Sequence, residues 1–94
     1  MKAKKKTVNK SWVVYILRCK DNTLYTGITI DIKKRLGAHN KGIAAKYTRS
    51  RLPVKLMTMS GFMSRKEAMR LEIRIKRMPK AKKIPALTGI KRAK

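Results

Sequence analysis

Two short runs of strand-like residues lie near the start of the chain. Residues 12–17 form a run of six apolar side chains, several of them β-branched or aromatic, which favours a β-strand. Residues 21–23 (Asp-Asn-Thr) then supply side chains typical of turns, and strand-like composition resumes over residues 24–28. The pattern therefore predicts a β-hairpin over residues 12–28, with a connection of about three to five residues.

A helix is predicted to follow the hairpin. Asp31 can cap it, residues 40–42 (Asn-Lys-Gly) can end it, and side chains between them recur at helical spacing: Ile32, Leu36 and His39. Residues 43–52 are then expected to form a basic loop. The Val, Leu, Met and Thr content of residues 54–60 predicts a third strand.

The most regular helical pattern lies in the second half of the chain. Residues 64–67 (Ser-Arg-Lys-Glu) form a capping box, and the positions after it define one inward-facing stripe: Ala68, Leu71, Glu72 and Ile75. Residues 81–87 favour a short turn of helix around Pro85, which Gly89 is expected to end. The elements therefore follow the order strand, strand, helix, strand, helix.

Length and composition limit the domain organisation. With 94 residues, the chain has room for one domain, and 43% hydrophobic residues allow it a modest core. We expect a basic disordered arm over residues 1–10, one domain over residues 11–90 and a basic tail over residues 91–94. The lone Cys19 permits no internal disulfide and is expected to be a small buried side chain.

The charge of the chain indicates its class of partner. It has 27 Lys and Arg against 4 Asp and Glu, a net charge of +23. Such a surface concentrates polyanions, so nucleic acid is the first partner to consider. No apolar run approaches the ~18 residues of a spanning helix, and no signal peptide is recognisable. We therefore expect a cytoplasmic protein with no membrane partner; no protein partner can be inferred.

Candidate chemistry comes from polar residues near the apolar faces. Arg35 and His39 border the inward face of the first helix, and Glu72 falls in the stripe of the second, where a carboxylate needs a partner. Tyr15 and Tyr25 share one face of the hairpin if odd positions pair with odd positions. These five side chains could therefore converge on one surface.

Each of these residues also has a simpler interpretation. Tyr15 and Tyr25 could be ordinary half-buried strand residues. Arg35 could pair with Asp31 one turn earlier, and His39 could be a helix-terminal histidine facing the helix dipole. Glu72 could form a structural ion pair with a neighbouring Lys or Arg.

Several short motifs follow one another in a fixed order along residues 12–87. They are Val13-Val14-Tyr15, Tyr25-Thr26-Gly27 ten residues later, Arg35, His39 and a helical Glu72, with residues 45–49 and 68–72 extending the pattern. Their order and spacing resemble the GIY-YIG nuclease superfamily, in particular its small members related to the excinuclease amino-terminal domain. Val13 and Thr26 stand where the family motifs have Gly and Ile, but neither lost side chain would do chemistry.

The resemblance implies a fold and a reaction. The implied fold is a single α+β domain, β-β-α-β-α, with a small three-stranded antiparallel sheet flanked by helices. The implied reaction is hydrolysis of DNA phosphodiester bonds by an endonuclease, in repair or recombination, with one Mg²⁺ or Mn²⁺ held by Glu72. Tyr25 would help to take a proton from the attacking water, assisted by Tyr15 and His39, while Arg35 would neutralise charge on the phosphate.

Basic residues and one tyrosine are the expected contacts to nucleic acid. The phosphate backbone of DNA, or of RNA, is expected to meet the residues Lys33, Lys34, Lys46, Tyr47, Arg49 and Lys76. The rival function is a non-catalytic nucleic-acid-binding protein, architectural or ribosome-associated. A nuclease that has lost its activity and only binds lies between the two. A carboxylate near the phosphate-contacting face favours the nuclease, because a pure binder would be weakened by it.

Overall fold

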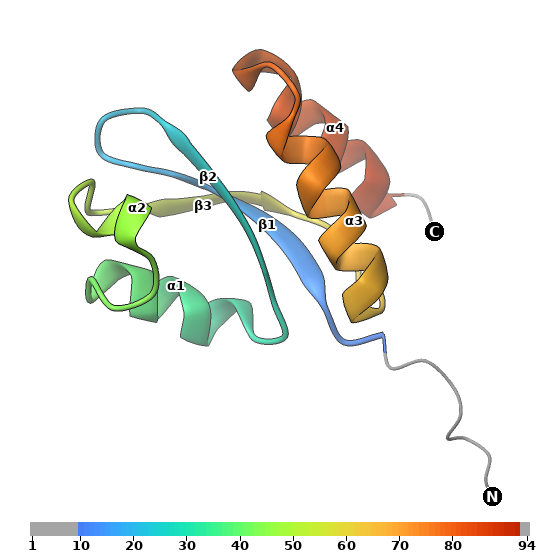
Figure 1. Cartoon of the computed structure of the whole chain (residues 1–94), viewed down its shortest axis with the longest axis horizontal. Helices are drawn as coiled ribbons and strands as arrows, with labels where there is room; N and C mark the ends of the chain where they lie inside the picture. Colours follow the sequence, from blue (N-terminus) through green and yellow to red (C-terminus); the bar gives the residue numbers. More distant parts are fainter. Residues whose placement is uncertain (1–9, 93–94) are drawn as a thin grey trace, which may run out of the picture.

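The computed structural model describes residues 10–92 (Figure 1). Residues 1–9 of the expected arm and residues 93–94 of the expected tail lie outside the described residues. The elements are, in chain order, β1 (Val13–Arg18), β2 (Leu24–Thr29), α1 (Ile32–Asn40), α2 (Lys46–Arg49), β3 (Lys55–Met59), α3 (Arg65–Lys76) and α4 (Lys80–Arg92). The predicted α+β fold is confirmed, and α2 and α4 are added to its core.

The three strands form one antiparallel sheet in the order β2-β1-β3. Between the first two strands, Tyr15 pairs with Gly27 and Leu17 pairs with Tyr25. Opposed residues share a face of a sheet, so this odd-with-odd register places Tyr15 and Tyr25 on the same face. The central position of β1 explains its unbroken apolar run, because both of its faces are covered.

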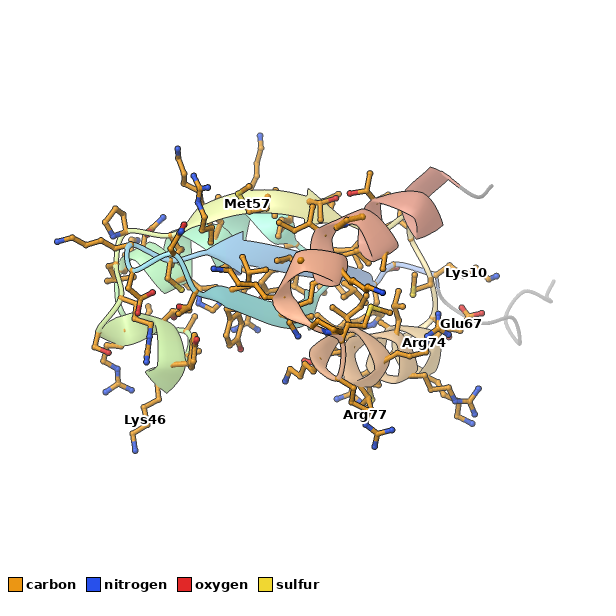
Figure 2. The ribbon with its side chains drawn as sticks, turned by 90° about the horizontal axis from the view of Figure 1, so that it is seen from above. Lys10, Lys46, Met57, Glu67, Arg74 and Arg77 are labelled. Atoms are coloured by element: carbon orange, nitrogen blue, oxygen red, sulfur yellow. The ribbon has the colours of Figure 1, made fainter. Side chains whose placement is uncertain are left out.

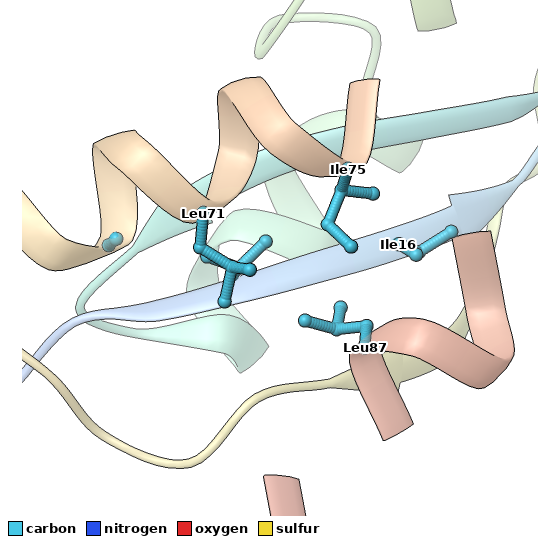
Figure 3. Packing of buried hydrophobic residues seen from close by; sticks show 6 residues of the cluster. Ile16, Leu71, Ile75 and Leu87 are labelled. Atoms are coloured by element: carbon cyan, nitrogen blue, oxygen red, sulfur yellow. The ribbon is translucent and has the colours of Figure 1, made fainter. Parts of the chain in front are cut away.

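Helices cover both faces of this sheet (Figure 1). α3 and α4 lie on one face, where the core consists of Val14, Ile16, Ala68, Leu71, Ile75 and Leu87 (Figure 3). α1 lies on the other face, and its Ile32 and Leu36 pack against a second cluster made of Tyr15, Leu17, Cys19 and Val54. Cys19 is a free, buried cysteine, as expected.

The segment 43–52 is not entirely a loop, because it contains the single-turn helix α2. The Thr48 hydroxyl donates to the Ala45 carbonyl at 3.2 Å, and the Thr48 side chain is fully buried. Four residues are too few to show a helical period in a sequence, so the pattern of apolar positions could not predict this turn.

The α4 helix is longer than the short turn expected around Pro85, and Gly89 does not end it. Pro85 removes one helical hydrogen bond. Burial of Leu87 and a 2.9 Å hydrogen bond between the Thr58 and Thr88 hydroxyls hold the helix on the sheet in compensation. Residues 91 and 92 of the expected tail are therefore helical. Within residues 10–92, no helix is long and apolar enough to span a membrane.

Candidate active site

A chain of hydrogen bonds runs from β1 through α1 to α2. The Tyr15 hydroxyl lies 2.9 Å from His39 Nε2, and His39 Nδ1 lies 2.8 Å from the Thr48 hydroxyl. Thr48 uses its only hydrogen on the Ala45 carbonyl. It must therefore accept from Nδ1–H, which leaves Nε2 as the acceptor for the Tyr15 hydroxyl. The surrounding bonds thus select one tautomer of His39.

The ends of α1 explain how His39 reaches this position. The Asp31 carboxylate accepts from the Lys34 backbone N–H and starts the helix, and His39 follows in its last turn with 1% of its surface exposed. Burial, and then the nearby Arg35 guanidinium, lower the pKa of His39. His39 is therefore a neutral, fully bonded side chain, which excludes the simpler interpretation of a histidine that merely faces the helix dipole.

Tyr15 is a proton donor in this chain. Its ring is 2% exposed, and burial is the largest cause of a strongly raised pKa of its phenol. The neighbouring Tyr25 and the Glu72 carboxylate raise this pKa further, whereas Arg35 lowers it. Tyr25, Arg35 and Glu72 therefore all influence the ionisation of the Tyr15 phenol.

Tyr25 is more accessible than Tyr15 and lies in a cluster of aromatic rings. Its ring centroid is 5.0 Å from that of His39, 5.9 Å from that of Tyr47 and 6.3 Å from that of Tyr15. The Arg51 guanidinium lies 4.1 Å from the centroid of the Tyr47 ring. These contacts fix the Tyr25 ring while leaving part of it open to a hollow lined also by Tyr47 and Lys76.

Gly27 is required where Tyr15 crosses the neighbouring strand. A Cβ atom added at Gly27 would lie 2.6 Å from the Tyr15 hydroxyl oxygen and 2.7 Å from the adjacent ring carbon. Any side chain at this position would therefore push the Tyr15 hydroxyl away from His39.

Arg35 and Glu72 flank this cluster from opposite faces of the sheet. Within residues 10–92, the ion pairs are Asp21–Arg51 and Glu72–Lys76, so Arg35 does not pair with Asp31. Arg35 instead lines a hollow of about 400 Å³ beside α1. Its cation is therefore available to a ligand.

Glu72 lies at the border of the buried stripe of α3 rather than inside it. Its side chain is 22% exposed and lies 3.4 Å from the ammonium of Lys76, one turn later. The interpretation of Glu72 as half of an ion pair therefore holds, but 54% of the Lys76 side chain is exposed. A pair this open to water binds Glu72 weakly, so the carboxylate stays accessible.

The predicted binding residues are spread over three helices. Lys33 and Lys34 are exposed on α1, Lys46, Tyr47 and Arg49 are exposed on α2, and Lys76 is exposed at the end of α3. Figure 2 shows Lys46 of α2 and Arg77, the residue that follows α3, pointing outward on the same side of the molecule. Cations from both sides therefore surround the β2 edge, where Tyr25 lies.

Sequence reasoning did not identify Thr48, Gly27 or Lys83 as site residues. The positions of Thr48 and Gly27 inside motifs already matched were a signal for both. Lys83 gave no such signal. Its ammonium donates to the Ile75 and Lys76 carbonyls, both at 3.0 Å, and it lines the hollow beside Tyr25. Only the packing of α4 against α3 brings it there.

The donor set suits a divalent cation that keeps most of its water. No group of three or more His, Cys, Asp or Glu side chains in the described part of the chain could hold a metal. Glu72 offers a single accessible carboxylate. Mg²⁺ is commonly bound through one or two carboxylates, several waters and substrate phosphates, so the residues present fit such an ion.

Comparisons with known proteins agree with this geometry. Residues 11–84 match the family model of the GIY-YIG catalytic domain. A UPF0213 protein of Streptococcus agalactiae is 52% identical over 81 residues, covering 86% of this chain and 89% of the relative. A UPF0213 protein of Halobacterium salinarum is 50% identical over 70 residues, covering 74% and 91% of the two chains.

A solved structure supports the same assignment. The solution NMR structure of a UPF0213 protein from Bacillus halodurans is 40% identical, with a TM-score of 0.51 and 87% of each chain covered. The chain therefore belongs to the GIY-YIG catalytic domain family and, within that family of nucleases, to the UPF0213 group of small proteins.

Proposed function

We propose that this chain hydrolyses phosphodiester bonds of DNA as a metal-dependent endonuclease, in repair or recombination. The observation that carries the proposal is the buried hydrogen-bonded chain from Tyr15 through His39 to Thr48, together with the influence of Tyr25, Arg35 and Glu72 on the Tyr15 phenol at one end of it. A protein that only binds phosphates has no need for a neutral histidine fixed in one tautomer. This arrangement therefore favours catalysis over the non-catalytic rival.

The proposed roles follow from the accessibility of each group. Tyr25 is open to the hollow that Tyr47 and Lys76 also line, and it helps to take a proton from the attacking water. The Tyr15 hydroxyl donates its hydrogen to His39 Nε2, which Thr48 holds in the accepting tautomer, so the Tyr15 oxygen can accept a hydrogen bond from the attacking water. Arg35 stabilises the charge that develops on the phosphate, an effect worth roughly 3–4 kcal/mol for a preorganised donor.

Glu72 holds the metal in this proposal. When bound, Mg²⁺ or Mn²⁺ would stabilise the leaving oxygen. Glu72 must exchange its contact with Lys76 for the ion. This exchange costs little because the pair is open to water.

The test is cleavage of single-stranded, duplex and branched DNA, with and without Mg²⁺ or Mn²⁺, under single-turnover conditions. We expect Arg35→Ala to lower the rate by about 10²- to 10³-fold. Tyr25→Phe should likewise lower the rate far more than the affinity, because these interactions strengthen in the transition state. Arg74→Ala removes an exposed arginine from α3, outside the site, and should leave the rate unchanged.

Equal losses of affinity and rate in both site variants would place Arg35 and Tyr25 in ground-state binding. Binding without any metal-dependent cleavage of the three DNA forms would establish the non-catalytic rival.

A further inference from the structure

Three hollows lie one after another, and the first of them begins at Tyr25 of the candidate site. The first, about 320 Å³, is lined by Leu24, Tyr25, Thr26, Tyr47, Lys76 and Lys83. The second, about 460 Å³, shares Leu24 with the first. The third, about 330 Å³, shares Arg18 and Asn22 with the second. Neighbouring hollows therefore share lining residues, and we call the series, from the β2 edge around the hairpin end of the sheet to the start of β3, the hairpin groove.

The lining of the hairpin groove is cationic along its whole length. It includes Lys76, Lys83, Lys80, Arg18, Lys20 and Lys55, and none of its described lining residues is acidic. Asp21 lies in the hairpin turn, but its carboxylate is bonded to Arg51 at 3.0 Å. The hollow beside Arg35, in contrast, has one carboxylate in its lining, that of Asp31, next to the cations of Lys34 and Arg35. The two sides of the site therefore differ in their attraction for an anion.

Lys83 gives the mouth of the groove a fixed cation. Two backbone carbonyls hold its ammonium. Burial and the neighbouring charge of Lys76 both lower the pKa of Lys83. The repulsion between these two ammonium groups would be relieved by an anion placed between them, which is a reason for a phosphate to bind there.

We propose that the hairpin groove holds, through its phosphates, the DNA strand that continues beyond the scissile phosphate. This inference rests on the proposed function, because it takes the strand to begin at Tyr25. Beyond Tyr25 and Tyr47 at the mouth, the lining contains no described aromatic side chain on which a base could stack. The groove therefore positions a strand without selecting its sequence.

The test compares two triple variants of equal net charge. The groove variant, Lys20→Gln/Lys55→Gln/Lys80→Gln, changes exposed lysines of the hairpin groove. The control, Lys10→Gln/Lys41→Gln/Lys66→Gln, changes exposed lysines elsewhere. Binding of labelled single-stranded and duplex DNA is measured at several salt concentrations, with a chelator present, so that affinity is read without cleavage. Thermal melts verify that both variants fold.

The salt slope is the slope of log affinity against log salt concentration. In the groove variant it should become less steep by about 0.7–0.9 for each phosphate contact removed, roughly two to three in total. At about 0.1 M salt this corresponds to a loss of affinity of roughly 100-fold or more. The control should keep the slope of the wild type. Equal slopes and affinities for the two variants would overturn the inference.

Failure of the groove and failure of the proposed function give different results. If the wild type cleaves DNA but the two variants bind alike, the groove is wrong and the hydrolysis stands. If the wild type cleaves none of the DNA forms but the groove variant loses its salt slope, the groove binds nucleic acid and the hydrolysis is wrong.

Discussion

Both ring nitrogens of His39 are committed to hydrogen bonds, and each partner is itself held in place. Tyr15 is fixed by burial in the centre of the sheet, and Thr48 by the Ala45 carbonyl. Such a network is worth most when every member is bonded, because an unpaired polar group in a buried position is costly. The protonation and tautomer of His39 therefore depend on the hydroxyl groups of Tyr15 and Thr48, which belong to two other elements.

Thr48→Val should damage the site without changing its shape. The valine keeps the volume but leaves the His39 Nδ1–H without its partner, which should lower the free energy of unfolding by about 1–3 kcal/mol. Urea unfolding measures this loss, and the ¹⁵N shifts of the His39 ring report the tautomer. Thr48→Ser restores the hydroxyl and should restore the tautomer. An unchanged tautomer in the valine variant would show that Thr48 does not select it.

Stability should depend on pH through His39. Its pKa is lowered in the folded state, so the unfolded state binds more protons as the pH falls below the ordinary value of 6.5. The stabilisation by neutral His39 is therefore complete above pH 6.5 and is lost as the pH falls through the lowered pKa. Chemical unfolding between about pH 5 and pH 8 measures this slope.

His39→Gln should flatten that slope. The carboxyls of Asp21 and Glu67 also have lowered pKa values, but their ordinary values of 3.8 and 4.5 place their effects at more acidic pH. A slope that survives in the glutamine variant would assign it to another group.

Two glycine substitutions should have effects of opposite sign. In Gly27→Ala, the new methyl group meets the Tyr15 hydroxyl, and such overpacking costs about 1–3 kcal/mol. In Gly37→Ala, the new methyl group meets nothing within 4 Å on the exposed face of α1, so helix propensity should add about 0.5–1 kcal/mol. Thermal melts compare the two. An unchanged melting temperature of the Gly27→Ala variant would mean that Tyr15 moves without a loss of stability.

At the scale of elements, one face of α3 packs into the core, and the border of that face carries the candidate metal ligand Glu72. Its capping box joins Ser64 and Glu67, and Ala68, Leu71 and Ile75 form its buried stripe. An α-helix turns by about 100° per residue, so Glu72, one position after Leu71, falls at the edge of this stripe. The carboxylate can therefore serve the site without entering the core.

Glu72→Leu should abolish metal-dependent cleavage while leaving the melting temperature of the metal-free protein nearly unchanged. An exposed pair one helical turn apart contributes only about 0.3–0.5 kcal/mol, and its loss leaves no buried cation unpaired. Glu67→Gln is the matched control on the same helix, because glutamine also completes a capping box. A large drop in melting temperature with surviving cleavage would exclude Glu72 as the metal ligand.

At the scale of the whole molecule, which carries a net charge of +23, contacts of Lys and Arg with phosphates should dominate binding. If six to ten phosphates are neutralised, affinity should fall by roughly 10³- to 10⁵-fold between 50 and 200 mM salt. Fluorescence anisotropy with labelled DNA measures this dependence. A flat response to salt would contradict the whole nucleic-acid interpretation.

The sequence by itself determined the hairpin, α1 and the start of α3. These features follow from local rules, because Asp31 and Ser64 cap the helices that follow them. Alternation placed Tyr15 and Tyr25 on one face only on the condition that odd positions pair with odd positions, and the structure supplies that register. The motifs also brought Arg35, His39 and Glu72 into consideration before any fold was known. Local periodicity was sufficient because these features need no partner that is distant in the sequence.

Only the tertiary structure decided how the site is assembled. The bond from His39 to Thr48 joins two helices, and the position of Lys83 beside Tyr25 joins the last helix to the hairpin. The close approach of the Tyr15 hydroxyl to Gly27 depends on the register of the hairpin. Periodicity assigns a residue to a face, but not to its partner across that face. The distances and the tautomer of His39 are set by packing of helices on both faces of the sheet, which no local pattern encodes.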